Sequence, residues 1–260
     1  MSQEKPNVSL FFPVFKDERT VRAVAEKALG VLRDVADKYE VIIVDDGSPD
    51  RAGEIADELA RQYPNISVIH HPKNLGYGAA IKSGLARCQY EWICFTDGDD
   101  EYDVNDLRKL IALKDFYDLV ITFRYVKVYP GDRQFISWVY NMTLRTLFRT
   151  QYRDVSTGLK LIRKTLADSI ECQSNSPFIG AEITIKSMLK GYRIGEVGIQ
   201  TFPREFGKGA STSPANIAAT IRDMLHVYRT IFSPEYELPQ NRERASAPTR
   251  DGGSSTHPRA

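Results

Sequence analysis

Four carboxylates stand within seven residues at positions 95–101, which read FTDGDDE. Asp97, Asp99, Asp100 and Glu101 come directly after EWICF, an apolar run typical of a buried strand. Carboxylates this close repel one another, and removing them from water is costly. A divalent cation relieves both costs, and Asp and Glu oxygens are ligands that Mg²⁺ and Mn²⁺ prefer. The spacing therefore indicates a metal site, although acidic residues after a strand are also typical of a solvated turn or a helix N-cap.

A second acidic pair, Asp45 and Asp46, follows the apolar run VIIV. Ligands of open α/β sheets bind outside the carboxyl ends of the strands, so both acidic clusters are expected to border one site. A metal held between such carboxylates and a diphosphate would neutralise a departing nucleoside diphosphate. His70 and His71 end a third strand, where neighbouring side chains point to opposite faces, so we expect no metal site from this pair.

The acidic segments belong to a region in which strands and helices alternate. Short apolar runs predict strands at 8–14, in YEVIIVDD, at 66–70, in EWICFT and in YDLVITF. Helical periodicity or a glycine-marked helix start lies between them, at 17–36, at 51–62, in NLGYGAAIKSGLARC and at 104–113. The apolar residues of VIIV do not alternate with polar ones, as in a parallel strand covered on both faces. This order predicts an α/β fold with a doubly wound sheet over the first ~125 residues.

The pattern changes after this region. Residues 134–149, QFISWVYNMTLRTLFR, predict an amphipathic helix with a basic face, and residues 133–164 carry seven basic residues and one acidic residue. Such a helix could lie in the interface of an anionic membrane, or pack on its own sheet with solvated arginines, and Trp138 fits either environment. Two more helices and a strand are expected at 178–190, 214–231 and 192–202.

Composition excludes several classes of protein. The 260 residues carry a formal net charge of +1, which excludes a strongly basic nucleic-acid-binding protein. The three cysteines form no CxxC pair and are expected to be reduced. The polar start MSQEKPN is no signal peptide, and no apolar run approaches the ~20 residues of a spanning helix. We therefore expect a cytoplasmic protein that can contact the inner face of the membrane, with one folded domain at 1–232 and a disordered polar tail at 233–260.

Four segments stand in a set order along the chain: PVFKDE at 13–18, VDDGSPD at 44–50, NLGYGAAIKSGL at 74–85 and DGDDE at 97–101. Together they resemble the family 2 glycosyltransferases of GT-A fold, and most closely the branch of dolichyl- or polyprenyl-phosphate sugar synthases. Later segments are similar to that branch as well: RDVSTGLKLIRK at 153–164, GAEITIKSMLKGYRIGEV at 180–197 and REFGKGAST at 204–212. The resemblance covers roughly residues 8–212. It implies a Rossmann-like, mostly parallel sheet flanked by helices, with amphipathic helices toward the C-terminus.

The resemblance also implies a donor site. In the family, the proline and the aromatic residue of the first motif line the nucleobase pocket, and here these are Pro13 and Phe15, with Asp17 close by. The second aspartate of the DDGS motif contacts the base or the ribose, which assigns that role to Asp46. The first and last aspartates of the DxD motif, Asp97 and Asp99, would bind the metal and the donor diphosphate. Glu101 stands where members of the synthase branch often carry Gln, and it is implied as a third ligand of Mg²⁺ or Mn²⁺.

Basic and catalytic residues follow from the same comparison of motifs. Arg204 and Lys208 of the R-x-x-GK motif would meet phosphates, and Arg124 after the fifth strand is expected to do the same. Glu182 lies where inverting members place a catalytic carboxylate, and it would act with Asp99 as the catalytic pair. As a general base, Glu182 would take a proton from an acceptor hydroxyl. Its structural alternative is a carboxylate in the first turn of a helix, which the helix dipole favours.

The expected activity is metal-dependent transfer of a sugar from a UDP- or GDP-sugar to an acceptor. The preferred acceptor is a polyprenyl phosphate, with peripheral membrane contact through 133–149 and no nucleic-acid partner. A saccharide or another soluble hydroxyl compound is the alternative acceptor, and Glu182 would then be needed as the base. A nucleotide-sugar-binding protein without catalysis is a third interpretation, and the intact pair of Asp97 and Asp99 argues against it.

Overall fold

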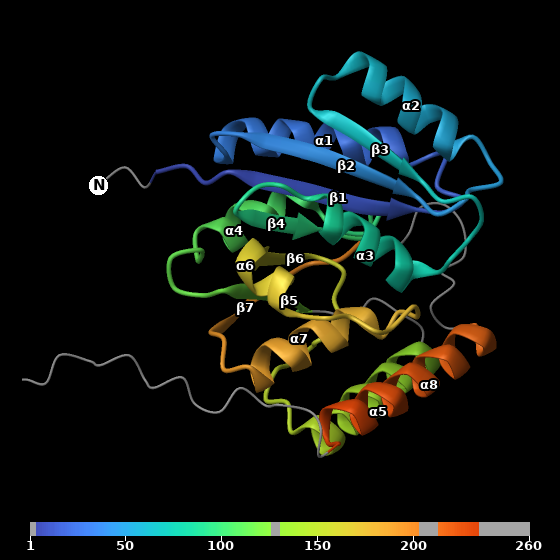
Figure 1. Ribbon diagram of the computed structural model, residues 1–260, viewed down its shortest axis with the longest axis vertical. Coiled ribbons are helices and arrows are strands. Elements are labelled where there is room, and N and C mark those ends of the chain that lie inside the picture. Colours follow the sequence, from blue (N-terminus) through green and yellow to red (C-terminus); the bar gives the residue numbers. More distant parts are fainter. Residues whose placement is uncertain (1–3, 126–130, 203–212, 234–260) are drawn as a thin grey trace, which may run out of the picture.

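The described part of the chain folds into a seven-stranded sheet with helices on both faces (Figure 1). The computed structural model describes residues 4–125, 131–202 and 213–233, without the side chains of residues 131–135. The strands lie in the order β3-β2-β1-β4-β6-β5-β7. Their bounds are Val8–Val14 (β1), Tyr39–Asp45 (β2), Ile66–His70 (β3), Trp92–Phe95 (β4), Leu119–Arg124 (β5), Lys160–Arg163 (β6) and Ile194–Ile199 (β7). The predicted α/β fold is confirmed, and the described sheet is parallel except for β6, which runs against both of its neighbours.

Strand β6 was not among the elements expected from the sequence. It is four residues long, KLIR, and it begins and ends with a basic side chain, so it carries no strand periodicity. Tertiary context creates this strand, because β6 fills the gap between β4 and β5 and pairs with both. The short helix α6 (Lys164–Ser169), which follows directly, was not expected either.

Helices cover both faces of the sheet, as a doubly wound fold requires. Residues 8, 10, 12 and 14 of β1 pack against α1 (Val21–Val35), α2 (Ala52–Gln62) and α4 (Leu107–Ile111), which follows the short 3₁₀ helix η1 (Val104–Asp106). Phe11 points to the other face, toward α3 (Tyr77–Arg87), α6 and α7 (Ile179–Leu189). Both faces of β1 are therefore buried, which explains why every side chain of the strand except that of Ser9 is apolar.

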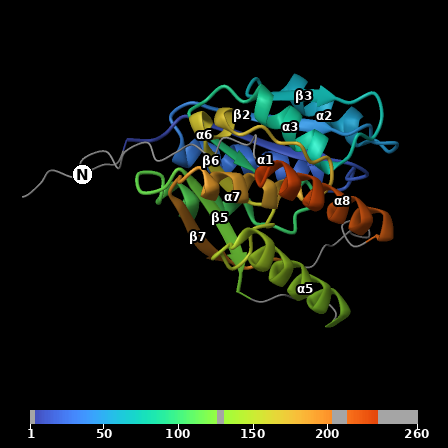
Figure 2. The same ribbon diagram turned by 60° about the horizontal axis from the view of Figure 1, so that its bottom comes forward.

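Two further helices form a separate layer beyond α7. Helix α5 (Gly131–Phe148) and helix α8 (Pro214–Ile231) pack with α7 around a third apolar cluster, which contains Phe148 and Val227 (Figures 1 and 2). The predicted bounds of α8 are confirmed, and those of α5 differ by up to three residues. This layer lies at the end of the molecule farthest from α2 (Figure 1).

The loops after β1, β2 and β4 meet at the carboxyl edge of the sheet, because the three strands are parallel neighbours. The loop after β4 is held against the first loop at Gly98, where a Cβ atom would lie 2.5 Å from the carbonyl oxygen of Pro13. Thr20 donates a hydrogen bond of 2.7 Å to the carbonyl oxygen of Gly98. Glycine is therefore required between the two aspartates of the DGD sequence, and the acidic loop is fixed against the first loop.

Candidate active site

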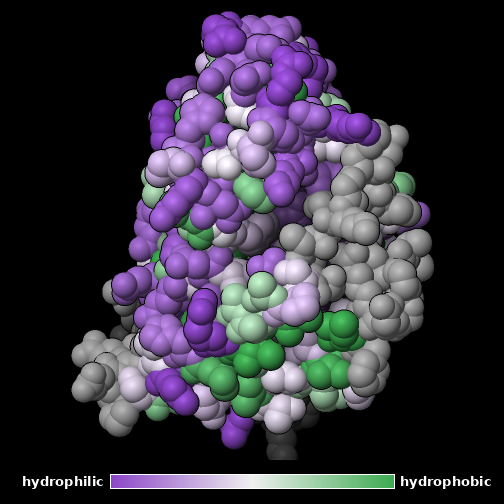
Figure 3. Space-filling model, turned by 90° about the vertical axis from the view of Figure 1, so that its right-hand side faces the viewer, coloured by the Kyte–Doolittle hydropathy of each residue, from purple (hydrophilic) through white to green (hydrophobic). Residues whose placement is uncertain are grey.

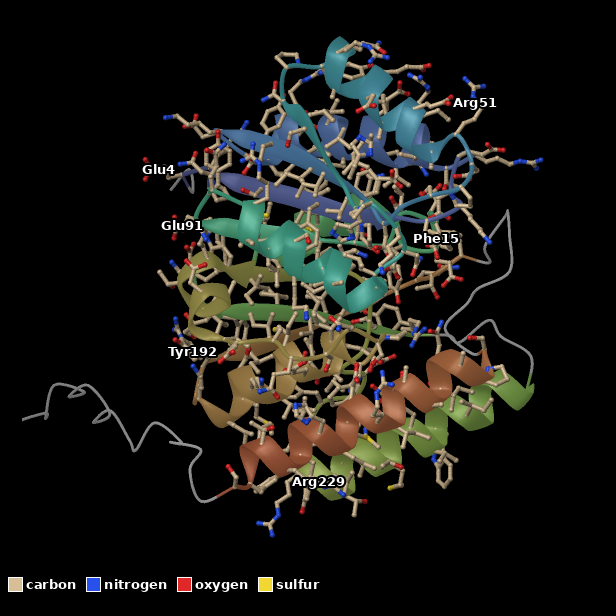
Figure 4. All side chains as sticks on the ribbon, turned by 45° about the vertical axis from the view of Figure 1, so that its right-hand side comes forward. Glu4, Phe15, Arg51, Glu91, Tyr192 and Arg229 are labelled. Carbon is tan, nitrogen blue, oxygen red and sulfur yellow. The ribbon has the colours of Figure 1, made fainter. Side chains whose placement is uncertain are left out.

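A pocket of about 700 Å³ opens at this carboxyl edge. Seven residues singled out in the sequence line it: Pro13, Phe15, Asp17, Asp46, Asp97, Asp99 and Glu101. Phe15 lies beyond the carboxyl end of β1 (Figure 4). The opposite wall comes from the segment at 175–177 and from Asn216, Ala219 and Arg222 of α8. Arg124 and Glu182 are not among the lining residues, and Arg204 and Lys208 lie outside the described residues.

The described lining of the pocket is strongly acidic. Five carboxylates face one cationic side chain, that of Arg222. Repulsion among the carboxylates and their partial burial both favour a bound cation, and the all-oxygen donor set fits Mg²⁺ or Mn²⁺. No three Asp, Glu, His or Cys side chains of the described residues are arranged to hold a metal by themselves. Mg²⁺ is commonly held by one or two carboxylates together with substrate phosphates, so the residues present fit a metal that binds with a diphosphate.

Asp46 is a buried residue of the pocket lining, and it holds the glycine-containing loop before α3. Its carboxylate accepts the backbone N–H groups of Leu75 and Gly76, each at 2.9 Å. The Nδ1 atom of His71 lies 2.7 Å from the same carboxylate, and its Nε2 atom lies 2.9 Å from the Oγ atom of Ser83. His71 therefore links Asp46 to Ser83 through its two ring nitrogens. The role of Asp46 at the base or ribose stays a prediction, and these bonds add the positioning of a pocket wall.

Hydrogen bonds orient the DxD carboxylates. Tyr77, the first residue of α3, donates from its hydroxyl to Oδ1 of Asp97 over 2.7 Å. Burial raises the pKa of Tyr77 well above its usual value, and the negative charge of Asp97 adds to this shift, so Tyr77 stays a neutral donor. Oδ1 of Asp99 accepts the backbone N–H of Glu101 at 3.0 Å. The three expected metal ligands thus line one pocket, and their roles as ligands stay predictions.

A buried charge cluster lies next to the pocket. Arg124 donates from Nε and Nη2 to Oδ2 of Asp154, over 3.2 and 2.7 Å, so its described partner is a carboxylate. Lys160 of β6 is completely buried and donates to the carbonyl oxygen of Val155 over 2.9 Å. Burial lowers the pKa of Lys160 to about 7, although Asp154 and Asp97 partly oppose this shift. The burial of Lys160 was not predicted from the sequence, because β6 is too short to be recognised as a strand.

The lowered pKa of Lys160 gives a test by stability. Between pH 7 and 8.5, the unfolded chain keeps a proton on Lys160 that the folded chain releases, because the unfolded pKa is near 10.5. Lys160 should therefore make the free energy of unfolding rise with pH by up to about 1.4 kcal/mol per unit. Urea denaturation of wild type and Lys160→Met, both in EDTA, should give slopes that differ by this amount. Equal slopes would mean that Lys160 keeps an ordinary pKa in the folded protein.

Glu182 is enclosed within the fold. Its side chain has no exposed surface, and its two carboxylate oxygens accept the backbone N–H groups of Gln173 and Ser174 at 2.8 and 2.9 Å. The ammonium group of Lys186, one turn along α7, lies 2.7 Å from Oε1. The residue implied as a base therefore has three partners inside the protein and does not reach the pocket lining.

A second carboxylate supports the same segment. Asp223 of α8 accepts the backbone N–H groups of Asn175 and Ser176, each at 3.0 Å. Glu182 and Asp223 together hold residues 173–176, which continue into the pocket wall. The sequence did not single out Asp223. The two contacts join residues 48 and 47 positions apart, so no local sequence pattern predicts them.

Solved structures show the class of fold. The structure of glucosyl-3-phosphoglycerate synthase from Mycobacterium tuberculosis with Mn²⁺, UDP and phosphoglyceric acid matches with a TM-score of 0.70 and 16% identity, over 86% of this chain and 78% of that chain. A further structure of that synthase, with Mg²⁺ and UDP, matches with a TM-score of 0.66. An open, mostly parallel sheet with an acidic pocket at its carboxyl edge is the GT-A arrangement, and this chain has it.

Sequence similarity gives the family. Residues 9–171 match the profile of glycosyl transferase family 2. The chain is 30% identical to undecaprenyl-phosphate mannosyltransferase of Micrococcus luteus over 192 residues, which are 69% of this chain and 79% of that protein. It is 25% identical to undecaprenyl-phosphate 4-deoxy-4-formamido-L-arabinose transferase of Pseudomonas fluorescens over 66% of this chain, and it spans about half of that protein (51%). The chain belongs to glycosyl transferase family 2, and the resemblance inferred from its motifs is confirmed.

Proposed function

We propose that this glycosyltransferase moves a sugar from a UDP- or GDP-sugar to a polyprenyl phosphate, with Mg²⁺ or Mn²⁺. The observation that carries this proposal is the position of α8, which lines the acidic pocket and also exposes apolar side chains at the surface. Two relatives are named as transferases of undecaprenyl phosphate, which supports a lipid phosphate as the acceptor class.

In the proposed site, the acidic edge receives the donor. Asp97, Asp99 and Glu101 would hold the metal, and the metal would neutralise the charge on the departing nucleoside diphosphate. Pro13, Phe15, Asp17 and Asp46 would bind the nucleoside part, and Arg204 and Lys208 would meet its phosphates. Arg124 is assigned to the buried pair with Asp154, from which it supports the neighbouring strand ends.

The acceptor chemistry agrees with the enclosure of Glu182. A phosphate oxygen is already anionic, so it can attack the anomeric carbon without losing a proton to a base. A hydroxyl acceptor needs a general base within hydrogen-bond reach. Glu182 is fully buried and bound to two backbone N–H groups and Lys186, so the geometry does not favour the hydroxyl alternative. We assign Glu182 to positioning the pocket wall.

The surface that would meet the membrane comprises parts of α5 and α8. Apolar side chains are exposed on both helices: Ile136, Trp138, Val139 and Met142 on α5, and Ile221 and Leu225 on α8. Apolar residues gather at the lower end of the face in Figure 3, where these helices lie. Trp138 is 58% exposed, so it is no core residue in this structure. None of the helices in the described part of the chain is long and apolar enough to cross a membrane.

The protein should sediment with anionic liposomes and not with neutral ones. Exposed basic residues near such a surface contribute ~1 kcal/mol each, so salt should reverse the binding. Trp138→Ala combined with Arg145→Glu should weaken sedimentation and transfer to polyprenyl phosphate, while hydrolysis of the donor is unchanged. Arg61→Glu, the same charge reversal on an exposed residue of α2 at the other end of the molecule, is the matched control (Figure 1). Equal binding by both variants would contradict docking through α5.

A further inference from the structure

Arg222 is the one cationic side chain among the described residues that line the acidic pocket. Its side chain is 77% exposed, and its Nε atom lies 3.6 Å from Oδ1 of Asp223. The other oxygen of Asp223 accepts the backbone N–H groups of Asn175 and Ser176. The guanidinium is solvated and lies 3.6 Å from this carboxylate, so the ion pair contributes little and the guanidinium can turn to an anion that enters the pocket.

Arg222 lies at a boundary between two surfaces of α8. Ala219, three residues before it, lines the pocket, and Leu225, three residues after it, is an exposed apolar side chain. Residues three apart on a helix are neighbours on its surface. Arg222 therefore lies between the polar pocket and the apolar outer face of α8.

We propose that Arg222 binds the phosphate of the acceptor, and this proposal rests on the function proposed above. An anionic acceptor would be repelled by the pocket carboxylates, and the only described cation in the lining stands where such an acceptor would enter from an apolar surface. A planar guanidinium can hold two phosphate oxygens at once. A third, anionic phosphate oxygen then attacks the anomeric carbon. The bond from that carbon to the nucleoside diphosphate breaks, and the diphosphate leaves with the electron pair.

The shared chemistry of the ligand is a phosphomonoester, which can be carried by an isoprenoid chain or by a soluble compound. Transfer should therefore be measured with a short-chain polyprenyl phosphate and, separately, with butyl phosphate, a soluble phosphomonoester that carries no hydroxyl group. We expect Arg222→Ala to raise the KM for the phosphate acceptor tenfold to a hundredfold, the loss typical of one charge-assisted contact. The KM for the donor should change much less than the KM for the acceptor. Arg222→Lys should give an intermediate KM, because it keeps the charge and loses the fork.

Arg229→Ala is the matched control, since Arg229 is exposed two turns further along the same helix and is not among the pocket residues (Figure 4). Inorganic phosphate should compete with the acceptor in wild type and Arg229→Ala, and much less in Arg222→Ala. An effect with polyprenyl phosphate alone assigns a lipid source, and an effect with butyl phosphate alone assigns a soluble one. Equal KM values for the two variants would overturn the role of Arg222 and leave the proposed function standing. A wild-type protein that hydrolyses the donor and glycosylates neither phosphate would overturn both.

Discussion

Asp99→Asn is expected to lower sugar transfer by about a thousandfold or more while the protein stays folded. A metal that stabilises charge on a leaving group supplies several kcal/mol in the transition state, and each 1.36 kcal/mol is a factor of ten in rate. Asn keeps an oxygen that can accept the N–H of Glu101, so the local turn is preserved. Binding of a UDP- or GDP-sugar, measured by thermal stabilisation, should lose its dependence on Mn²⁺ in this variant.

The adjacent residue provides the control for this prediction. Asp100 is half-buried, pairs with Lys27 and is not among the pocket residues, so Asp100→Asn removes the same charge one position away. Asp100 has a positive φ of 59°, a conformation that Asn tolerates, so the Asp100→Asn substitution adds no backbone strain. Asp100→Asn should transfer sugar at close to the wild-type rate. Full activity of Asp99→Asn, or of wild type in EDTA, would contradict a metal–diphosphate site.

The fold was predictable from the sequence because most of its strands are buried on both faces. Short, mostly apolar runs such as VSLFFPV and VIIV indicate strands that are buried on both faces, and the helices between them have a clear apolar stripe. The acidic ends of β2 and β4 could be placed at one edge before the structure was known, since parallel neighbours bring their carboxyl ends together. The position of these acidic residues at the ends of their strands therefore predicted their position at the pocket.

The rest of the site depends on contacts between distant segments, which no local pattern encodes. His71, the residue after β3, supports Asp46, and Asp223 of α8 supports Ser176. The spacing of residues in a motif also does not indicate whether a side chain is buried. Glu182 occupies a position that resembles that of a catalytic carboxylate, yet its environment is that of a buried ion pair. Lys186 stands four residues after Glu182, and this spacing on a helix was the available signal for such a pair.

Glu182→Ala should lower the free energy of unfolding by about 3–5 kcal/mol, the typical cost of leaving one member of a buried ion pair without its partner. The substitution removes the carboxylate that pairs with the ammonium group of Lys186. It also removes the acceptor of two backbone N–H groups in the segment at 173–174. Urea denaturation measures this loss. Glu182→Ala combined with Lys186→Met should recover part of it, because the unpaired buried charge is gone.

Activity separates this positioning role from the role of a base. If Glu182 only holds the pocket wall, the fraction of Glu182→Ala that stays folded should bind the donor more weakly than wild type. The double variant should regain little of this binding, because the N–H groups of Gln173 and Ser174 still lack their acceptor. The pH dependence of kcat should keep its wild-type shape, because no essential base has been removed. A general base contributes roughly 10²–10⁴ in rate. Glu182→Gln with the stability of wild type and a kcat lowered by that factor would instead assign Glu182 as the base, and with it a hydroxyl acceptor.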